Sequence, residues 1–199
     1  PMARWCDVFC DIGAFSTDQA WRILEAGKAS GLLPRIHANE LASSGGVDVA
    51  ASVGAASADH LLYLHPQEAR NLAAKGCVGV LCPVTALSLG RFPPAKMMKS
   101  EGMTIAIASD FNPGTAYCES LQFALAIATR TMGMGIEDAL LAATRGGAAA
   151  LRRTDIGRVA VGCLADIVML EADSYLDIGY HAGINLASMV VKRGKVVAA

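Results

Sequence analysis

Charged residues are scarce in this sequence, and neither sign of charge predominates. Asp, Glu, Lys and Arg make up 18% of the 199 residues, and the formal net charge is -1. A nearly neutral chain gives no electrostatic basis for binding nucleic acid or an anionic membrane, so we expect neither partner. Hydrophobic residues account for 53% of the chain, which is enough for a large core and excludes a disordered chain.

Features of membrane, secreted and redox proteins are also missing. No apolar run approaches the roughly 20 residues that cross a bilayer, and the opening PMARWCDVFC lacks the layout of a secretory leader. At this length a disulfide framework is not expected, so we predict reduced thiols and a cytoplasmic protein. The cysteines form no C-x-x-C pair, and most lie in apolar segments: Cys6, Cys10, Cys77, Cys82, Cys118 and Cys163.

Strand-like and helix-like segments alternate over the first 150 residues. Two longer helical patterns end this region, at 119–132 and 136–151. Continuous apolar strands that alternate with helices indicate a parallel sheet covered by helices, either a doubly wound sheet or a (β/α)8 barrel. The strands are expected at 5–10, 34–38, 57–64, 77–83 and 103–109.

The pattern changes after about residue 155. Segments 156–173 and 189–198 have the composition of short strands with tight turns, and Arg193-Gly194 predicts a two-residue hairpin turn. We therefore expect an α/β part over residues 1–154 and a small antiparallel β unit over residues 155–199.

Ionisable side chains stand where several predicted strands end. In a barrel such positions converge on one mouth, where active sites are built, whereas in a doubly wound sheet they spread along an edge. No Gly-rich phosphate-binding fingerprint follows any strand, so the barrel is the better interpretation. The residues at four strand ends are Asp11, His37 with Glu40, Asp59 with His60, and Asp110.

Two histidines, an aspartate and a glutamate at one mouth indicate a divalent metal such as Zn²⁺ or Fe²⁺. Such a metal makes water nucleophilic near neutral pH, and a nearby carboxylate or imidazole can carry the proton. Taken singly, His37 could be a hydrogen-bonded core histidine and Asp110 could simply cap the following turn. The joint pattern at three strand ends favours the metal site.

At these positions the residues resemble a known family. RIHANEL, SADHL and ASDFNPGT resemble barrel strands five, six and eight of the amidohydrolase superfamily. Within it, DFNPGT together with DVFCDIGAFS is similar to the imidazolonepropionase family, hydrolases that open a ring in histidine degradation. The resemblance runs over essentially the whole chain, and it implies strands four to eight of a (β/α)8 TIM barrel followed by part of a C-terminal β-sandwich.

The resemblance implies a role for each matching residue. His37 and Asp110 would be ligands of one zinc or iron ion, and Asp110 would also take up the proton of the attacking water. His60 would polarise the scissile carbonyl or help orient the water. The implied reaction is hydrolysis of the cyclic amide 4-imidazolone-5-propanoate to N-formimidoyl-L-glutamate. The implied substrate contacts are Glu40 at a ring nitrogen, and Asn112, Gly114 and Thr115 in the turn.

One departure from the superfamily is large. Its members carry an H-x-H pair at the end of the first barrel strand, and this sequence contains no H-x-H. Five predicted strands precede the β unit, whereas a barrel needs eight. We therefore expect the C-terminal half of a protein about twice as long, inactive without its other half and a homodimer when complete.

Two other functions stay open. The same layout of strand ends serves aminohydrolases that act on purines or aromatic amines. A half-barrel without its H-x-H could instead be a non-catalytic part that assembles with a partner chain.

Overall fold

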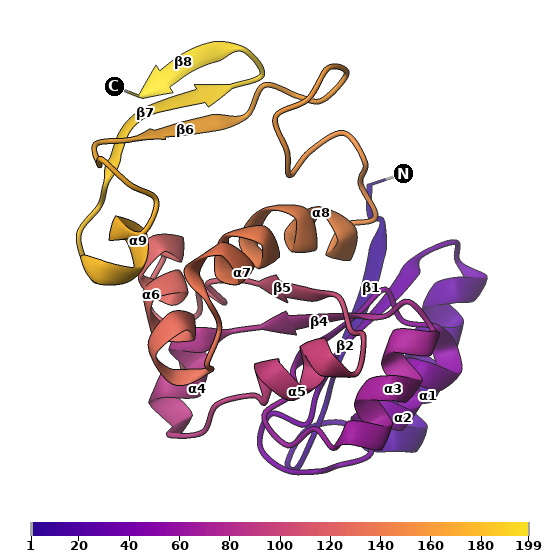
Figure 1. The fold of residues 1–199 in the computed structure, drawn as a ribbon. Coiled ribbons are helices and arrows are strands. Elements are labelled where there is room, and N and C mark those ends of the chain that lie inside the picture. The colour runs from indigo at the N-terminus through magenta and orange to yellow at the C-terminus, as the bar shows by residue number, and fades with distance from the viewer. Residues whose placement is uncertain (1, 199) are drawn as a thin grey trace.

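Five parallel strands form the central sheet, in the order β1-β2-β3-β4-β5. The structure is a computed structural model and describes residues 2–198. Each strand pairs with the next one along the chain, and helical segments connect them (Figure 1). The predicted α/β class and all five predicted strands are confirmed: β1 (Trp5–Cys10), β2 (Leu33–Ala38), β3 (Ser57–His60), β4 (Val78–Leu81) and β5 (Ile105–Ile107).

The connecting helices pack against one face of this sheet. Val8, Ile36 and Leu81 on that face share a hydrophobic core with Leu24 and Met98 of the helices. Pro83, which the sequence analysis placed at the end of the fourth strand, instead begins a helix, as proline readily does in a first turn. These helices are α1 (Thr17–Ala29), α2 (Gly46–Val53), α3 (Pro66–Ala74), α4 (Pro83–Leu89) and α5 (Ala95–Ser100).

The second face of the sheet is covered only in part. Ala149 and Ala150 pack on Val78 and Val80 of β4 and on Ala106 of β5. Both alanines belong to the last of four consecutive helical segments, α6 (Leu121–Thr131), α7 (Ile136–Leu141), the π-helical turn η1 (Ala142–Gly146) and α8 (Gly147–Ala150).

On β1 and β2 the second face carries polar side chains. Asp7, Arg35 and His37 lie there and are partly or largely exposed, while the alternate residues Val8 and Ile36 are buried. The predicted parallel sheet covered by helices is therefore observed on the first face, while the second face is covered at β4, whose four residues are all buried, and not at β1 and β2.

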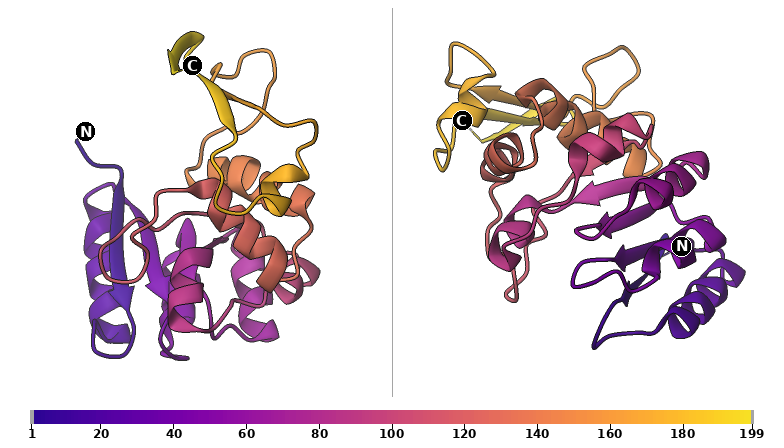
Figure 2. Two further views of the ribbon diagram at one scale, coloured as in Figure 1. Left: turned by 90° about the vertical axis from the view of Figure 1, so that its left-hand side faces the viewer. Right: turned by 60° about the horizontal axis from the view of Figure 1, so that its bottom comes forward.

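A second, three-stranded antiparallel sheet follows and stands apart from the first (Figure 2). It consists of β6 (Ile167–Leu170), β7 (Ala187–Lys192) and β8 (Lys195–Ala198), with the short helix α9 (Asp177–Tyr180) between β6 and β7. Arg193 and Gly194 join β7 to β8, both with positive φ, which confirms the predicted hairpin turn. The strand expected in residues 156–166 is absent, since turns occupy that segment.

Two predictions about composition can be compared with the structure. All six cysteines are free. None of the helices in residues 2–198 combines the length and apolar character of a membrane span.

The contact between η1 and β5 requires a glycine. A Cβ atom on Gly146 would lie 2.0 Å from the carbonyl oxygen of Ile105, so Gly146→Ala should lower the free energy of unfolding by about 1–3 kcal/mol or more. Gly147 is the matched control, because a Cβ there would meet nothing within 4 Å and Gly147→Ala should stabilise the helix by about 0.5–1 kcal/mol. Urea denaturation measures both values, and equal midpoints for the two variants would contradict this packing.

Candidate active site

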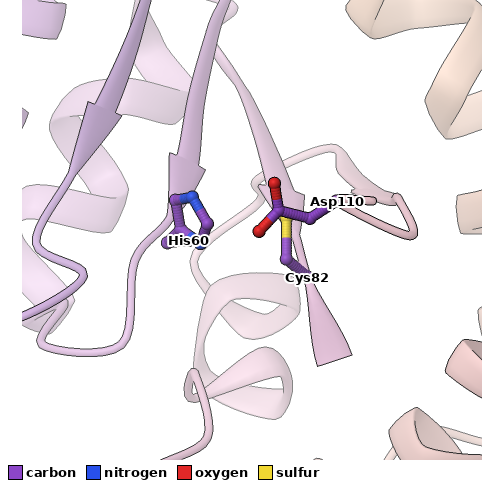
Figure 3. A group of neighbouring side chains, drawn as sticks. All are labelled: His60, Cys82 and Asp110. Atoms are coloured by element: carbon purple, nitrogen blue, oxygen red, sulfur yellow. The ribbon is translucent and has the colours of Figure 1, made fainter. Parts of the chain in front are cut away.

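The carboxyl ends of the parallel strands bring four predicted site residues together. The rings of His37 and His60 lie side by side, with their centroids 5.2 Å apart. His60 Nε2 lies 3.5 Å from Glu40 Oε2. A carboxylate oxygen of Asp110 lies within 4.8 Å of a ring nitrogen of His60 (Figure 3). Residues separated by up to 73 positions in the sequence therefore share one small volume.

Unusual backbone conformations accompany these strand ends. Asn39, His60, Leu61 and Asp110 all have positive φ, between 52° and 75°. Non-glycine residues in this region cost on the order of 1–3 kcal/mol each, and such strain concentrates at functional sites. Asn39 is buried, and its side-chain amide donates to the carbonyl oxygen of Tyr63 at 3.1 Å.

His60 is the most enclosed of the titratable site residues. Burial lowers its pKa to about 4, so its imidazole is neutral at neutral pH. Burial, and after it the charge of Asp110, raises the pKa of Glu40. Nδ1 of His60 is buried and has no hydrogen-bond partner within residues 2–198. This ring therefore has an unused nitrogen in a space lined by acids.

His37 has a partner that sequence reasoning missed. Its Nδ1 lies 3.1 Å from a carboxylate oxygen of Asp7, and this hydrogen bond raises the pKa of His37 to about 9. The position of Asp7 could not indicate a site residue, because Asp7 lies in the middle of β1 and not at the strand end. With Nδ1 bound to Asp7, the other ring nitrogen is the one available to a metal.

Asp59 points to the same face as His37. Burial raises the pKa of its carboxyl to about 6. One ligand atom from each of Asp7, His37 and Asp59 lies within 4.8 Å of the other two. The parallel register that pairs His37 with Asp59 accounts for this closeness.

The turn after β5 is held by its own hydrogen bonds. Asn112 Oδ1 accepts the backbone N–H groups of Gly114 at 2.8 Å and Thr115 at 2.9 Å, and Asn112 Nδ2 donates to the carbonyl oxygen of Asp110. The fully buried Thr85 donates its hydroxyl to Asp110 Oδ2 at 2.5 Å. The turn thus fixes the backbone of Asp110, and Thr85 fixes one of its carboxylate oxygens. The substrate roles of Asn112, Gly114 and Thr115 stay predictions.

Asp11 connects the first strand end to the loop that carries Glu40. Its Oδ2 accepts the backbone N–H groups of Glu40 at 2.7 Å and Leu41 at 2.9 Å, while Oδ1 accepts that of Ile12. Asp11 is buried. The sequence predicts Asp11 as an ionisable residue at a strand end. In the structure its carboxylate positions the backbone of the loop that carries Glu40.

Cys82 and Thr85 are two further residues that the sequence analysis did not select. Cys82 directly follows β4, and one of its neighbours at the mouth is Asp110, whose carboxylate lies within 4.8 Å of the Cys82 sulfur. Cys82 is a ligand-type side chain at a strand end, as Asp110 is. The sequence alone does not favour a metal role for Cys82, because buried thiols usually act as small apolar groups.

These side chains fit a divalent metal. Imidazole nitrogen, carboxylate oxygen and thiol sulfur are all ligands that zinc accepts, and the unpartnered buried nitrogen of His60 is of the kind that an ion would satisfy.

A model of the amidohydrolase family matches residues 26–197. This chain belongs to the amidohydrolase family. Two curated relatives are the imidazolonepropionases of Streptomyces griseus subsp. griseus, 46% identical over 99% of this chain, and of Rhodococcus jostii, 44% identical over 98%. These alignments cover 51% and 48% of the two relatives, so the chain spans about half their length. The resemblance seen in the sequence is confirmed.

Solved structures show the same fold. A zinc-bound adenosine deaminase from Xanthomonas campestris superposes with a TM-score of 0.74 at 22% identity, over 94% of this chain and 50% of the deaminase. A triazine hydrolase variant gives a TM-score of 0.80 at 18% identity, over 96% of this chain and 49% of the hydrolase. At these identities the similarity establishes an amidohydrolase-type α/β fold.

The hydrogen bonds of Asp11 predict a large cost for its removal. Asp11→Ala leaves three backbone N–H groups without their acceptor, and each one that stays buried costs about 1–3 kcal/mol. Faster amide exchange at Glu40 and Leu41 should accompany the loss of stability. Asp18→Ala is the control, since Asp18 forms an ion pair with exposed Arg22 on the surface of α1 and its loss should cost less than about 1 kcal/mol. Unchanged exchange at Glu40 in Asp11→Ala would contradict the role of Asp11.

Proposed function

We propose that this chain carries the catalytic strand ends of a hydrolase that opens the ring of 4-imidazolone-5-propanoate. The observation that carries the proposal is the convergence of His37, Glu40, His60 and Asp110 at one mouth. It occurs in a chain that aligns over 99% of its length with an imidazolonepropionase. Identity of 40–46% to eight such relatives supports this substrate over others used by the superfamily.

We infer that β1 to β5 correspond to strands four to eight of a (β/α)8 barrel. Five consecutive parallel strands in sequence order support this assignment, as does the half-length alignment with the relatives. In this view residues 1–154 belong to the barrel, and residues 155–199 belong to a β-sandwich to which other segments of the protein add strands.

His37 and Asp110 are the proposed metal ligands. A divalent metal, zinc or iron, supplies Lewis acidity and lowers the pKa of water at the site. The carboxylate of Asp7 holds the ring of His37 through Nδ1, as carboxylates commonly do for metal-binding histidines.

The remaining steps follow from the surroundings of each side chain. An ionised carboxylate has about four lone-pair sites, so Asp110 can accept the Thr85 hydroxyl at Oδ2, hold the metal and still take a proton from the attacking water. His60 is neutral and donates a hydrogen bond to the carbonyl oxygen of the substrate, which stabilises the negative charge that develops there. Asp110 then returns the proton to the ring nitrogen as the C–N bond breaks, so that water is divided between a carboxylate and the released nitrogen.

Glu40 is placed to recognise the second ring nitrogen. Glu40 lies 3.5 Å from His60. The group proposed to bind the ring nitrogen is therefore next to the group proposed to bind the carbonyl oxygen. The Asn112 turn directly follows Asp110 and is hydrogen-bonded to it, so its polar groups are the ones we assign to the rest of the substrate.

Asp110→Asn should reduce turnover by at least about 100-fold, since it removes the group that carries the proton, while the thermal unfolding curve stays cooperative. The measurement uses the complete protein that contains this chain. Asp48→Asn, on the exposed surface of α2, is the control and should keep its rate. A rate like that of the unsubstituted protein in Asp110→Asn would remove Asp110 from the mechanism.

Product analysis separates the competing functions. Incubation of the complete protein with 4-imidazolone-5-propanoate should consume the ring and yield N-formimidoyl-glutamate without free ammonia, because hydrolysis breaks an amide bond inside the ring. Ammonia released from purines or aromatic amines, with the imidazolone untouched, would indicate an aminohydrolase. Metal binding with no product from any of these substrates would indicate a non-catalytic part.

A further inference from the structure

Cys82 lies between two residues of the proposed mechanism. It directly follows β4, the strand that pairs with β3 on one side and β5 on the other. His60 ends β3, and Asp110 lies just beyond β5. Figure 3 shows the three side chains directed toward one another from these three neighbouring strand ends. The Cys82 sulfur, a His60 ring nitrogen and an Asp110 oxygen all lie within 4.8 Å of one another.

Burial separates this cluster from a chance grouping on the surface. His60 is 2% exposed and Cys82 is 4% exposed. His60 Nδ1 has no hydrogen-bond partner among the described residues, although a buried polar nitrogen normally has one. Within residues 2–198, the only side-chain hydrogen bond of Asp110 uses Oδ2, with Thr85 as the donor. One nitrogen of His60 and one carboxylate oxygen of Asp110 are therefore without a hydrogen bond among the described residues.

The three atoms form a mixed nitrogen, oxygen and sulfur ligand set. Metal–ligand bonds of about 2.0–2.3 Å in a tetrahedral zinc site place ligand atoms about 3.3–3.8 Å apart. The present separations are within about 1 Å of that range, a distance that side-chain rotation can close. A thiolate also makes a site softer than one of imidazole and carboxylate alone, which favours zinc over harder divalent ions.

We propose that Cys82 binds the metal of this site through its thiolate sulfur, beside Asp110 and His60, and that its thiol proton is released when the ion binds. The proposal deepens the function proposed above and rests on its metal, but it adds a ligand that the alignment of motifs did not suggest. One ring nitrogen of His60 then faces the ion, and the other keeps the hydrogen-bonding role proposed above. Zinc becomes the expected metal, in place of an open choice between zinc and iron.

Cobalt spectroscopy tests the ligand directly. The complete protein is freed of metal and titrated with Co²⁺, whose bonds to sulfur give charge-transfer absorption in the near ultraviolet. The unsubstituted protein should show this band at one equivalent. Cys82→Ser should bind cobalt without the band, and its zinc affinity in competition with a chelator should fall at least about tenfold.

Cys77→Ser is the matched control. Cys77 is also buried and immediately precedes the same strand, but it lies outside the cluster, so the band should persist. Cys82→Ala is a second variant that removes any ligand atom, and circular dichroism checks the fold of all three. If either Cys82 variant unfolds, the unsubstituted protein still tests the proposal, because absence of the band there would overturn it.

The outcomes separate this proposal from the one on which it rests. Cobalt bound without a charge-transfer band in the unsubstituted protein would overturn sulfur coordination and leave the hydrolase function intact. A band that survives in Cys82→Ala would also overturn it. Failure to bind any divalent metal would overturn both proposals.

Discussion

The parallel hydrogen-bond ladder from β1 to β5 is the constraint on which the site depends. It pairs His37 with Asp59 and Ala38 with His60, so it brings the ends of β2 and β3, with both site histidines, to adjacent positions. Because side chains alternate along a strand, a slip of one residue in β2 would turn His37 toward the helices and expose Ile36 or Ala38. Both of those neighbours are fully buried, so the hydrophobic core on one face sets the position of the chemistry on the other.

Acidic groups outnumber cations at this mouth, but burial and one hydrogen bond are the main causes of the pKa shifts. Burial and the charge of Asp110 raise the pKa of Glu40, and burial raises that of Asp59. The pKa of His37 rises to about 9 beside Asp7, so without a metal His37 is the imidazolium that offsets these charges. A metal bound at His37 has to displace that proton, and affinity should therefore increase with pH as His37 loses it.

Much of the fold could be predicted because its signals are local. Apolar runs, helix periodicity and the Arg193-Gly194 turn each depend on neighbouring residues, and each appears in the structure. The family motifs located His37, His60 and Asp110 for the same reason. Asp7 and Thr85 could not be found in this way, because they reach the site through strand pairing and a helix start that bring distant residues together. Cys82 was visible as a strand end, but its chemistry is ambiguous until its neighbours are known.

The π-helical turn η1 has a consequence for how this chain tolerates changes in length. A π turn accommodates one residue more than the regular helix around it, and each residue turns a helix by about 100°. Deleting one residue within 142–146 would therefore convert the π turn into regular helix and keep the phase of α8 relative to α7. The same deletion inside α7 would rotate α8 by about that angle and take Ala149 and Ala150 off Val78 and Val80. The turn is thus a place where the helix can lose one residue without uncovering this half of the sheet.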